Sequence, residues 1–245
     1  MKKILMVLSF GISTTLVAGC CSFGGSNVKL DTGKIEGLRK VALVGVCLQK
    51  DVSTIAGTQN TGTIRDGGKL LLGPLTESLN AALPTLWTGV EVVPLGPGIE
   101  AAGRTVGETR VCANDHDPMQ AGGFVGAPDK AYLGTLATRL NVDAVLVISG
   151  YPVVRFWDGK GAKLYVASVG DGFQTTLVNR LGEETASIQL RDFETAYSPE
   201  IASANNFVDV KPMGESLGKL VAEGFVANVQ SREWNPPSRP GLSGL

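Results

Sequence analysis

One short segment of the chain gathers side chains that could do chemistry. Asp115, His116 and Asp117 are consecutive in a glycine-rich stretch, and His116 is the only histidine. Imidazole and carboxylate groups are common metal ligands and acid–base catalysts. Neighbouring residues of a loop do not fix a coordination geometry, however, and aspartate favours turns. We therefore expect a solvated turn here, and a metal-dependent enzyme centred on Asp115-His116-Asp117 is the alternative.

Other catalytic arrangements find little support in the sequence. Any Ser-His-Asp or Cys-His arrangement would have to use His116. A phosphate-binding loop needs Ser or Thr after its Gly-Lys pair, whereas Gly68-Lys69 is followed by Leu70. We expect no enzyme, no cofactor and no bound metal.

A second segment with a reactive side chain, a cysteine, lies near the N-terminus. Met1-Lys2-Lys3 precedes a short apolar run that ends in Val17-Ala18-Gly19-Cys20. Two lysines, an apolar run and small residues are typical of a secretory signal peptide, and the run is too short for a stable membrane span. Val17-Ala18-Gly19-Cys20 resembles the bacterial lipobox, whose cysteine is acylated and becomes the first residue of the mature chain. We predict a signal peptide over 1–19 and lipidation, with palmitate for example, at Cys20. A plain signal peptide cut nearby is the alternative.

This resemblance also implies a location. In lipobox proteins an aspartate after the lipidated cysteine favours the inner membrane, and here Cys21 follows. We therefore expect a Gram-negative outer-membrane lipoprotein whose domain faces the periplasm, with a surface-exposed orientation left open. Removing Lys2 and Lys3 makes the net charge of −1 more negative by two. This balance favours neither nucleic acid nor an anionic membrane surface as a partner.

Two cysteines remain once Cys20 is assigned to lipid and Cys21 to the segment beside it. They are Cys47 and Cys112. An exported chain folds where disulfides persist, so a bridge between them is one expectation. A buried thiol at a strand end together with a loop thiol is the other.

The remaining sequence predicts one α/β domain over 40–232. A flexible tether (20–39) precedes it, a glycine-rich loop (96–128) interrupts it, and a disordered tail (233–245) follows. Apolar periodicity predicts strands over 40–46, 90–93 and 142–148, the last continuing extended over 151–157, and helices over 73–84 and 128–141. Further strands over 162–169, 173–179 and 184–193 and a helix over 213–230 complete the order, and 49–68 reads as a loop. The expected fold is a mixed sheet from strand-helix-strand-helix-strand, followed by an antiparallel meander and a closing helix.

Two of these segments resemble known envelope proteins. The segment 133–150, with Asn141-Val142-Asp143-Ala144 before an apolar strand, resembles a unit shared by three groups. These are the N-terminal domain of the Tol–Pal translocation protein, the lipoprotein activators of penicillin-binding proteins, and the curli-secretion-channel lipoproteins. The hairpin 176–187, with Gly182-Glu183 at its turn, resembles theirs too. The chain departs from the pattern in the loop 96–128 and in an extra strand around 151–157.

The resemblance implies a non-catalytic protein-binding or assembly module of the cell envelope. Its partner would be another envelope protein, and a homo-oligomer stays open. Curli-type members form oligomeric pores, so an oligomeric secretion-channel component is the alternative. Spanning strands need ~9–11 residues of alternating polarity. The run 164–167 is continuously apolar and 173–179 is short, which argues against that alternative.

Overall fold

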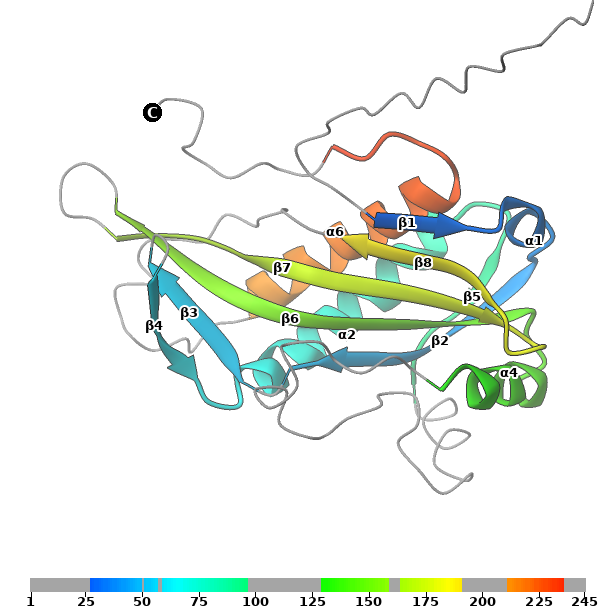
Figure 1. Cartoon of the computed structure of the whole chain (residues 1–245), viewed down its shortest axis with the longest axis horizontal. Helices are drawn as coiled ribbons and strands as arrows, with labels where there is room; N and C mark the ends of the chain where they lie inside the picture. The colour runs from blue at the N-terminus through cyan, green and yellow to red at the C-terminus, as the bar shows by residue number, and fades with distance from the viewer. Residues whose placement is uncertain are drawn as a thin grey trace, which may run out of the picture.

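The chain folds into an α/β domain built on one mixed β-sheet (Figure 1). A computed structural model describes residues 27–49, 51–56, 59–96, 129–158, 164–190 and 211–235. The main sheet has the order β1-β8-β7-β6-β2-β5. Its strands are β1 (Asn27–Leu30), β8 (Glu184–Leu190), β7 (Leu164–Asn179), β6 (Ala144–Asp158), β2 (Lys40–Leu48) and β5 (Glu91–Val93). Strand β2 is parallel to β5 and β6, and β6, β7, β8 and β1 are successively antiparallel. The predicted fold class, a mixed sheet with helices, is confirmed.

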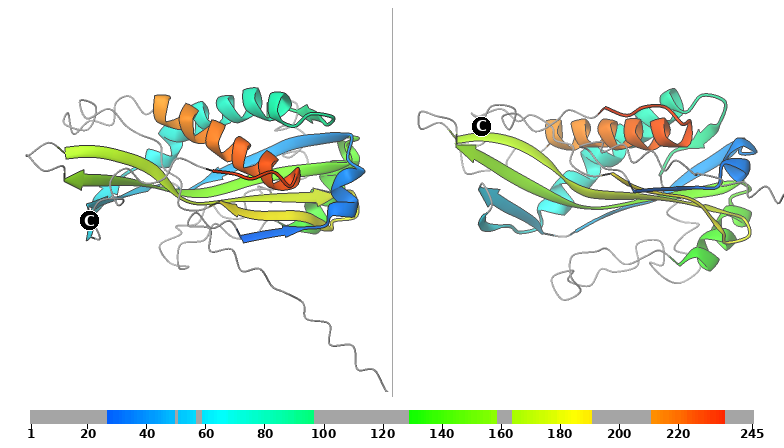
Figure 2. Two further views of the ribbon diagram at one scale, coloured as in Figure 1. Left: turned by 90° about the horizontal axis from the view of Figure 1, so that it is seen from above. Right: turned by 45° about the horizontal axis from the view of Figure 1, so that its top comes forward.

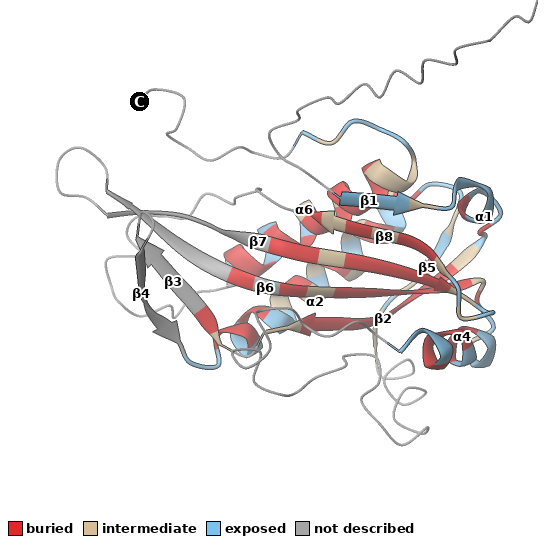
Figure 3. Ribbon diagram, in the orientation of Figure 1, coloured by how far each residue is buried: buried red, intermediate tan, exposed pale blue. Residues whose placement is uncertain are grey.

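Helices cover the two faces of the sheet unequally (Figure 2). Helices α2 (Gly67–Leu86) and α6 (Lys211–Val229) cross one face, and α4 (Lys130–Arg139) lies on the other. The larger apolar core fills the space beneath α2 and α6, and a smaller core lies beneath α4. Burial is concentrated in the middle strands of the sheet (Figure 3). Within the described residues, no helix combines the length and apolarity needed to cross a bilayer.

Helix α2 begins one to two turns before the predicted start at residue 73. Leu71, Leu75, Leu79 and Leu83 form one buried row, so the row starts four residues earlier than expected. Pro74 and Pro84 lie inside the helix rather than at its ends. A proline inside a helix costs ~3 kcal/mol, and burying a leucine returns ~1.5–3 kcal/mol. The four leucines together return ~6–12 kcal/mol, which matches or exceeds the ~6 kcal/mol cost of the two prolines.

A hairpin replaces the loop predicted over 49–68. Strands β3 (Val52–Ala56) and β4 (Gln59–Ile64) pair with each other, and β3 also runs parallel to the outer half of β6 (Figure 1). The segment is rich in threonine and isoleucine, whose branched side chains favour strands. The segment was predicted as a loop because it also contains many polar residues and glycines. The hairpin extends the sheet beyond the end of β2.

Strand β7 is continuous where the sequence predicts two strands and a turn. Gly150 pairs with Phe173 but Tyr151 pairs with Asp171, so Gly172 is an extra residue. Gly172 has a φ of 83°, a left-handed conformation that suits a bulge. Gly170-Asp171-Gly172 is thus a bulge and not a turn. The predicted extension over 151–157 is confirmed as the outer half of β6.

The folded domain also begins earlier than predicted. Strand β1 and helix α1 (Thr32–Glu36) lie in the segment 20–39 that was predicted as a tether. Ile35 and Leu38 are buried in the larger core, and Asp31 N donates to Thr185 O over 2.9 Å. The two apolar residues are too few to reveal a periodic pattern, which explains the error.

The far end of the domain differs from the prediction at one residue. Trp234 packs partly buried against the larger core, although the tail was predicted from residue 233. A Cβ on Gly224 of α6 would lie 2.7 Å from the indole. The glycine therefore makes room for the tryptophan. Residues 236–245 of the predicted tail lie outside the described residues.

Candidate docking surface beside helix α4

Most residues predicted to do chemistry lie outside the described residues. These are Cys20, Cys112 and the Asp115-His116-Asp117 segment. Cys47 lies on β2, is 5% exposed and is disulfide-bonded. Its partner is outside the described residues, so the pairing with Cys112 stays a prediction. The described part of the chain contains no cluster of three or more His, Cys, Asp or Glu side chains that could hold a metal.

A serine motif lies inside α6. Gly214-Glu215-Ser216-Leu217-Gly218 has the Gly-x-Ser-x-Gly spacing of hydrolase nucleophiles, which belong on a strand-to-helix turn. Here both glycines face α2. A Cβ on Gly214 would lie 2.8 Å from the Pro74 side chain, and one on Gly218 would lie 2.6 Å from Leu75 O. The two glycines are explained by close helix packing, and the position of Ser216 is not that of a nucleophile elbow.

The two segments that resemble envelope proteins meet at one end of the domain. Gly134 of α4 lies against Gly182 of the β7–β8 turn, and a Cβ on Gly134 would lie 2.5 Å from Gly182 N. Gly182 has a φ of 76°, which glycine adopts without strain. The close approach of the two backbones therefore depends on both glycines.

Asp143 ties this end to the start of β2. Its Oδ2 accepts hydrogen bonds from Arg39 N and Lys40 N, both 2.9 Å long. The Arg39 N–H contributes most to lowering the pKa of this carboxyl, with further lowering from Lys40 N–H and the Arg180 charge, against a desolvation that raises it. Just before it, Asn141 takes the left-handed φ of 52° at the end of α4, as predicted. The Asn-Val-Asp-Ala motif thus has a structural role.

Side-chain contacts hold the β7–β8 turn rigidly. Asn179 Oδ1 accepts from Leu181 N over 2.9 Å and from Glu183 N over 3.0 Å. Glu183 Oε2 accepts from Asn179 Nδ2 and from Lys34 Nζ of α1, both over 2.9 Å. The Lys34 contact and then the Asn179 contact lower the pKa of Glu183. Leu181 nevertheless remains 81% exposed at the tip of this turn.

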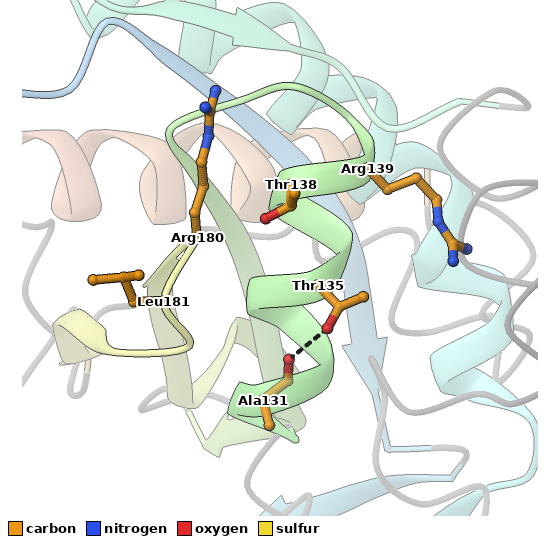
Figure 4. A pocket seen from close by; sticks show the side chains of 6 residues that line it. All are labelled: Ala131, Thr135, Thr138, Arg139, Arg180 and Leu181. Atoms are coloured by element: carbon orange, nitrogen blue, oxygen red, sulfur yellow. Dashed lines mark hydrogen bonds between the residues drawn. The ribbon is translucent and has the colours of Figure 1, made fainter.

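A groove separates the turn from α4, and we call it the α4 groove (Figure 4). Its volume is about 580 Å³, and its lining residues are Ala131, Thr135, Thr138 and Arg139 from α4 and Arg180 and Leu181 from the turn. Thr135 Oγ1 donates to Ala131 O and Thr138 Oγ1 donates to Gly134 O, each over 3.1 Å. Both hydroxyl protons are therefore used within the helix.

Arginines are the charged residues of this lining. Arg180 Nε donates to Val142 O over 2.6 Å, and its Nη2 donates to Asn141 Oδ1 over 3.3 Å and lies 3.7 Å from Asp143 Oδ1. Arg139 lies in the last turn of α4. Arginine stays protonated at all relevant pH values, and threonine needs a base to act as a nucleophile. This lining is suited to binding and not to acid–base catalysis.

The fold and this surface define an α/β domain with a candidate docking site. Among known protein families and curated proteins, none matches the sequence. The chain is similar to PelC from Paraburkholderia phytofirmans, which was solved as a dodecamer. The two sequences are 15% identical, the match covers 85% of this chain and 99% of that chain, and the TM-score is 0.32. It is also similar to lipoprotein GNA1162 from Neisseria meningitidis, with 14% identity, 71% and 97% covered, and a TM-score of 0.36. Likenesses at this level carry no conclusion about function.

Proposed function

We propose that this protein is a lipoprotein, anchored in the outer membrane through Cys20, whose domain is a non-catalytic module that binds another protein of the cell envelope. The lipobox-like Val17-Ala18-Gly19-Cys20 supports the anchor and the location. The resemblance of 133–150 and 176–187 to docking domains supports the class of activity. The structural roles of Asp143 and Gly182 agree with a module that has no catalytic residues to supply.

The observation that carries the proposal is the exposure of Leu181. Burying apolar surface contributes ~25 cal/mol per Å², and a leucine that is 81% exposed does not gain this free energy in the free protein. Single exposed leucines are common on surfaces, but this one stands on a turn fixed by Asn179 beside a groove. Because the backbone of this turn is already fixed, little backbone entropy is lost when a partner covers Leu181. These properties suit a binding anchor.

Site-specific crosslinking in cells tests this proposal. A photo-activated side chain in place of Leu181 should give one defined adduct with a second envelope protein. Leu70 offers a matched control, because it is a leucine that is 51% exposed and belongs to α2. Helix α2 lies on the face of the sheet opposite α4 (Figure 2). The proposal fails if position 181 gives no adduct, or if positions 181 and 70 give the same adducts.

The same experiment separates the alternative function. An oligomeric secretion-channel component would crosslink to a second copy of itself, and the adduct would have twice the mass of the chain. An adduct of any other mass favours the binding module.

A further inference from the structure

We infer that the free edge of β1 binds an extended segment of another protein as an added strand, and that this segment carries a carboxylate between two apolar residues. The edge is a different surface from the α4 groove and Leu181. The inference therefore goes beyond the proposed function and does not depend on it. The occupant is an acidic extended peptide segment and not a second copy of this chain.

Strand β1 offers backbone groups that point away from the sheet. It is the last strand at one edge (Figure 1), and among the described residues no strand pairs with its outer side. Asp31 N, just beyond β1, donates to Thr185 O over 2.9 Å. Antiparallel strands exchange hydrogen bonds at every second residue, so Lys29 also directs its backbone groups toward β8. The N–H and C=O groups of Val28 and Leu30 therefore face outward.

These outward groups are accessible to another chain. The first three residues of β1 are exposed (Figure 3), and Val28 is 39% exposed. An edge with unpaired N–H and C=O groups is a template for pairing with a further strand. In strand addition, main-chain hydrogen bonds provide the affinity and the side chains along the edge provide the sequence preference. The edge of β1 supplies two donors and two acceptors for such pairing.

The two faces of β1 differ in polarity. Val28 lies opposite Ile188 of β8, and this isoleucine belongs to the larger core. Leu30 lies opposite Ala186 of the same core. Successive side chains of a strand point to opposite faces, so Lys29 lies on the other face. An added strand continues both faces, and it should therefore place apolar residues beside Val28 and Leu30 and a hydrophilic residue beside Lys29.

Lys29 determines the charge of that hydrophilic residue. It is exposed, and within the described part of the chain it makes no ion pair. Asp31, two residues further along, already pairs with Lys34 over 3.3 Å. Because the backbone groups of Lys29 face β8, an added antiparallel strand meets it at a position without hydrogen bonds, where opposite side chains lie closest. A carboxylate is favourable there, and a second cation is not. The expected pattern is apolar, acidic, apolar.

A second copy of β1 does not provide this pattern. Antiparallel pairing of two β1 strands uses all the outward groups only if Val28 of each copy faces Leu30 of the other. That register places Lys29 directly opposite the same lysine of the second copy, and like charges in this position are destabilising. A register shifted by two residues uses only one outward residue of each copy. Lysine on an edge strand is a common means of preventing such self-pairing.

Labelled peptides test the expected pattern. Three soluble peptides would share threonine-rich flanks and have Val-Glu-Val, Val-Gln-Val or Val-Lys-Val at the centre. A fourth would be the glutamate peptide with N-methyl groups on both valines, which removes two main-chain donors. Binding to the full-length lipidated protein in detergent is measured by fluorescence anisotropy. We expect the glutamate peptide to bind roughly two- to fivefold more tightly than the glutamine peptide, and the lysine peptide to bind less tightly than either.

The methylated peptide should bind at least tenfold more weakly than its parent, because it has the same side chains but cannot complete the ladder. Added salt should reduce the preference for glutamate over lysine. Equal affinities for the glutamate and lysine peptides overturn the inference. Equal affinities for the methylated and unmethylated peptides, or no binding by the glutamate peptide, also overturn it.

Substitutions locate the binding on β1. Val28→Pro removes one outward N–H group without taking a hydrogen bond from the ladder with β8. It should weaken the glutamate peptide by about tenfold. Val28→Thr keeps this N–H group and a branched side chain, so it is the matched control and should retain most of the binding. Thermal unfolding of each variant checks the fold. Equal losses in the two variants overturn the inference.

A charge reversal tests the role of Lys29. Lys29→Glu should reverse the order of the glutamate and lysine peptides. Lys219→Glu makes the same change at an exposed position of α6 and should leave the order as it is. The same order of peptides in Lys29→Glu as in the wild type overturns the inference. Self-association that Val28→Pro abolishes would assign the edge to a second copy and overturn it too.

These tests are independent of the test of the proposed function. Crosslinking from position 181 reports on the β7–β8 turn, whereas the peptides report on the outer edge of β1. A failure at position 181 removes the proposed function and leaves the binding of the glutamate peptide to β1 in place. A failure of the peptides removes the added strand and leaves the proposed function in place.

Discussion

Replacing Asp143 gives the sharpest test of how the resembling motif works. Asp143→Ala removes the acceptor of two backbone N–H groups, those of Arg39 and Lys40. A hydrogen bond to a charged group contributes ~1.5–3 kcal/mol when buried. The Arg39 bond is exposed and the Lys40 bond is part-buried, so water compensates for part of the loss of both. We expect a loss of ~2–3 kcal/mol in the free energy of unfolding.

A urea titration followed by circular dichroism measures this loss. With a slope of ~2–3 kcal/mol per M, the unfolding midpoint should fall by about 1 M. Asp143→Asn keeps an acceptor oxygen without the charge and should lose roughly half as much. Glu77→Ala removes a carboxylate from an exposed position of α2 and should leave the midpoint unchanged. A midpoint that Asp143→Ala does not move refutes the structural role of this motif.

The pH dependence gives a second readout of Asp143. Its folded-state pKa lies below the usual value, chiefly because of the Arg39 N–H. A depressed carboxyl pKa stabilises the fold above the unfolded-state pKa of ~3.9, and the benefit disappears as the pH falls through the folded-state pKa. The stability difference between the wild type and Asp143→Asn should therefore be constant near neutral pH and shrink in acid. A difference that grows in acid contradicts the assigned sign.

The remaining predictions concern packing and the cysteines. Gly134→Ala should lower the free energy of unfolding by about 3 kcal/mol, because its Cβ would lie 2.5 Å from a backbone nitrogen, whereas Gly73→Ala, with nothing within 4 Å, should not destabilise; thermal unfolding compares the two. Cys20→Ser should accumulate as an unprocessed precursor without fatty-acid label, and normal labelling would disprove the anchor. Alkylation of the denatured, unreduced protein should leave Cys47 unmodified and peptide mapping should join it to Cys112; a free thiol at Cys112 would exclude that pairing.

Periodic burial made much of the fold predictable. The row of Leu75, Leu79 and Leu83 indicated α2, and continuous apolar runs indicated β2 and the inner half of β6. The ends of α4 were also readable, because Asp129 accepts a hydrogen bond from Tyr132 N and Asn141 adopts a left-handed φ. These signals are local, so the sequence alone carries them.

Errors arose where a long-range partner decides the structure. The threonine-rich hairpin β3–β4 depends on pairing with the distant outer half of β6. Gly172 forms a bulge instead of a turn because β6 continues beside it. β1 is held by its ladder with β8. A local pattern cannot show such pairing. The short strand assumed over 173–179 was wrong for the same reason, so strand length does not count against the secretion-channel alternative.

The candidate docking surface was only partly visible in the sequence. Leu181 in a Leu-Gly-Glu turn is an apolar residue where a polar one is usual, and this was a usable signal. The donation of the Thr135 and Thr138 hydroxyls to carbonyls of their own helix follows from side-chain directions that only coordinates reveal. The meeting of α4 with the β7–β8 turn needed the tertiary structure as well.

The early start of β1 limits how far the domain can lie from the membrane if Cys20 is the anchor. Asn27 is seven residues beyond Cys20, and even a fully extended chain covers only ~3.3–3.6 Å per residue, about 25 Å in all. Gln189 pairs with Asn27, and β8 runs back from there to its first residue at ~3.4 Å per residue, adding roughly 20 Å before the β7–β8 turn. The proposed anchor at Cys20 would therefore hold Leu181 within roughly 50 Å of the lipid surface. Only a partner that comes within this distance of the membrane, through its own anchor or by extending toward it, could contact Leu181.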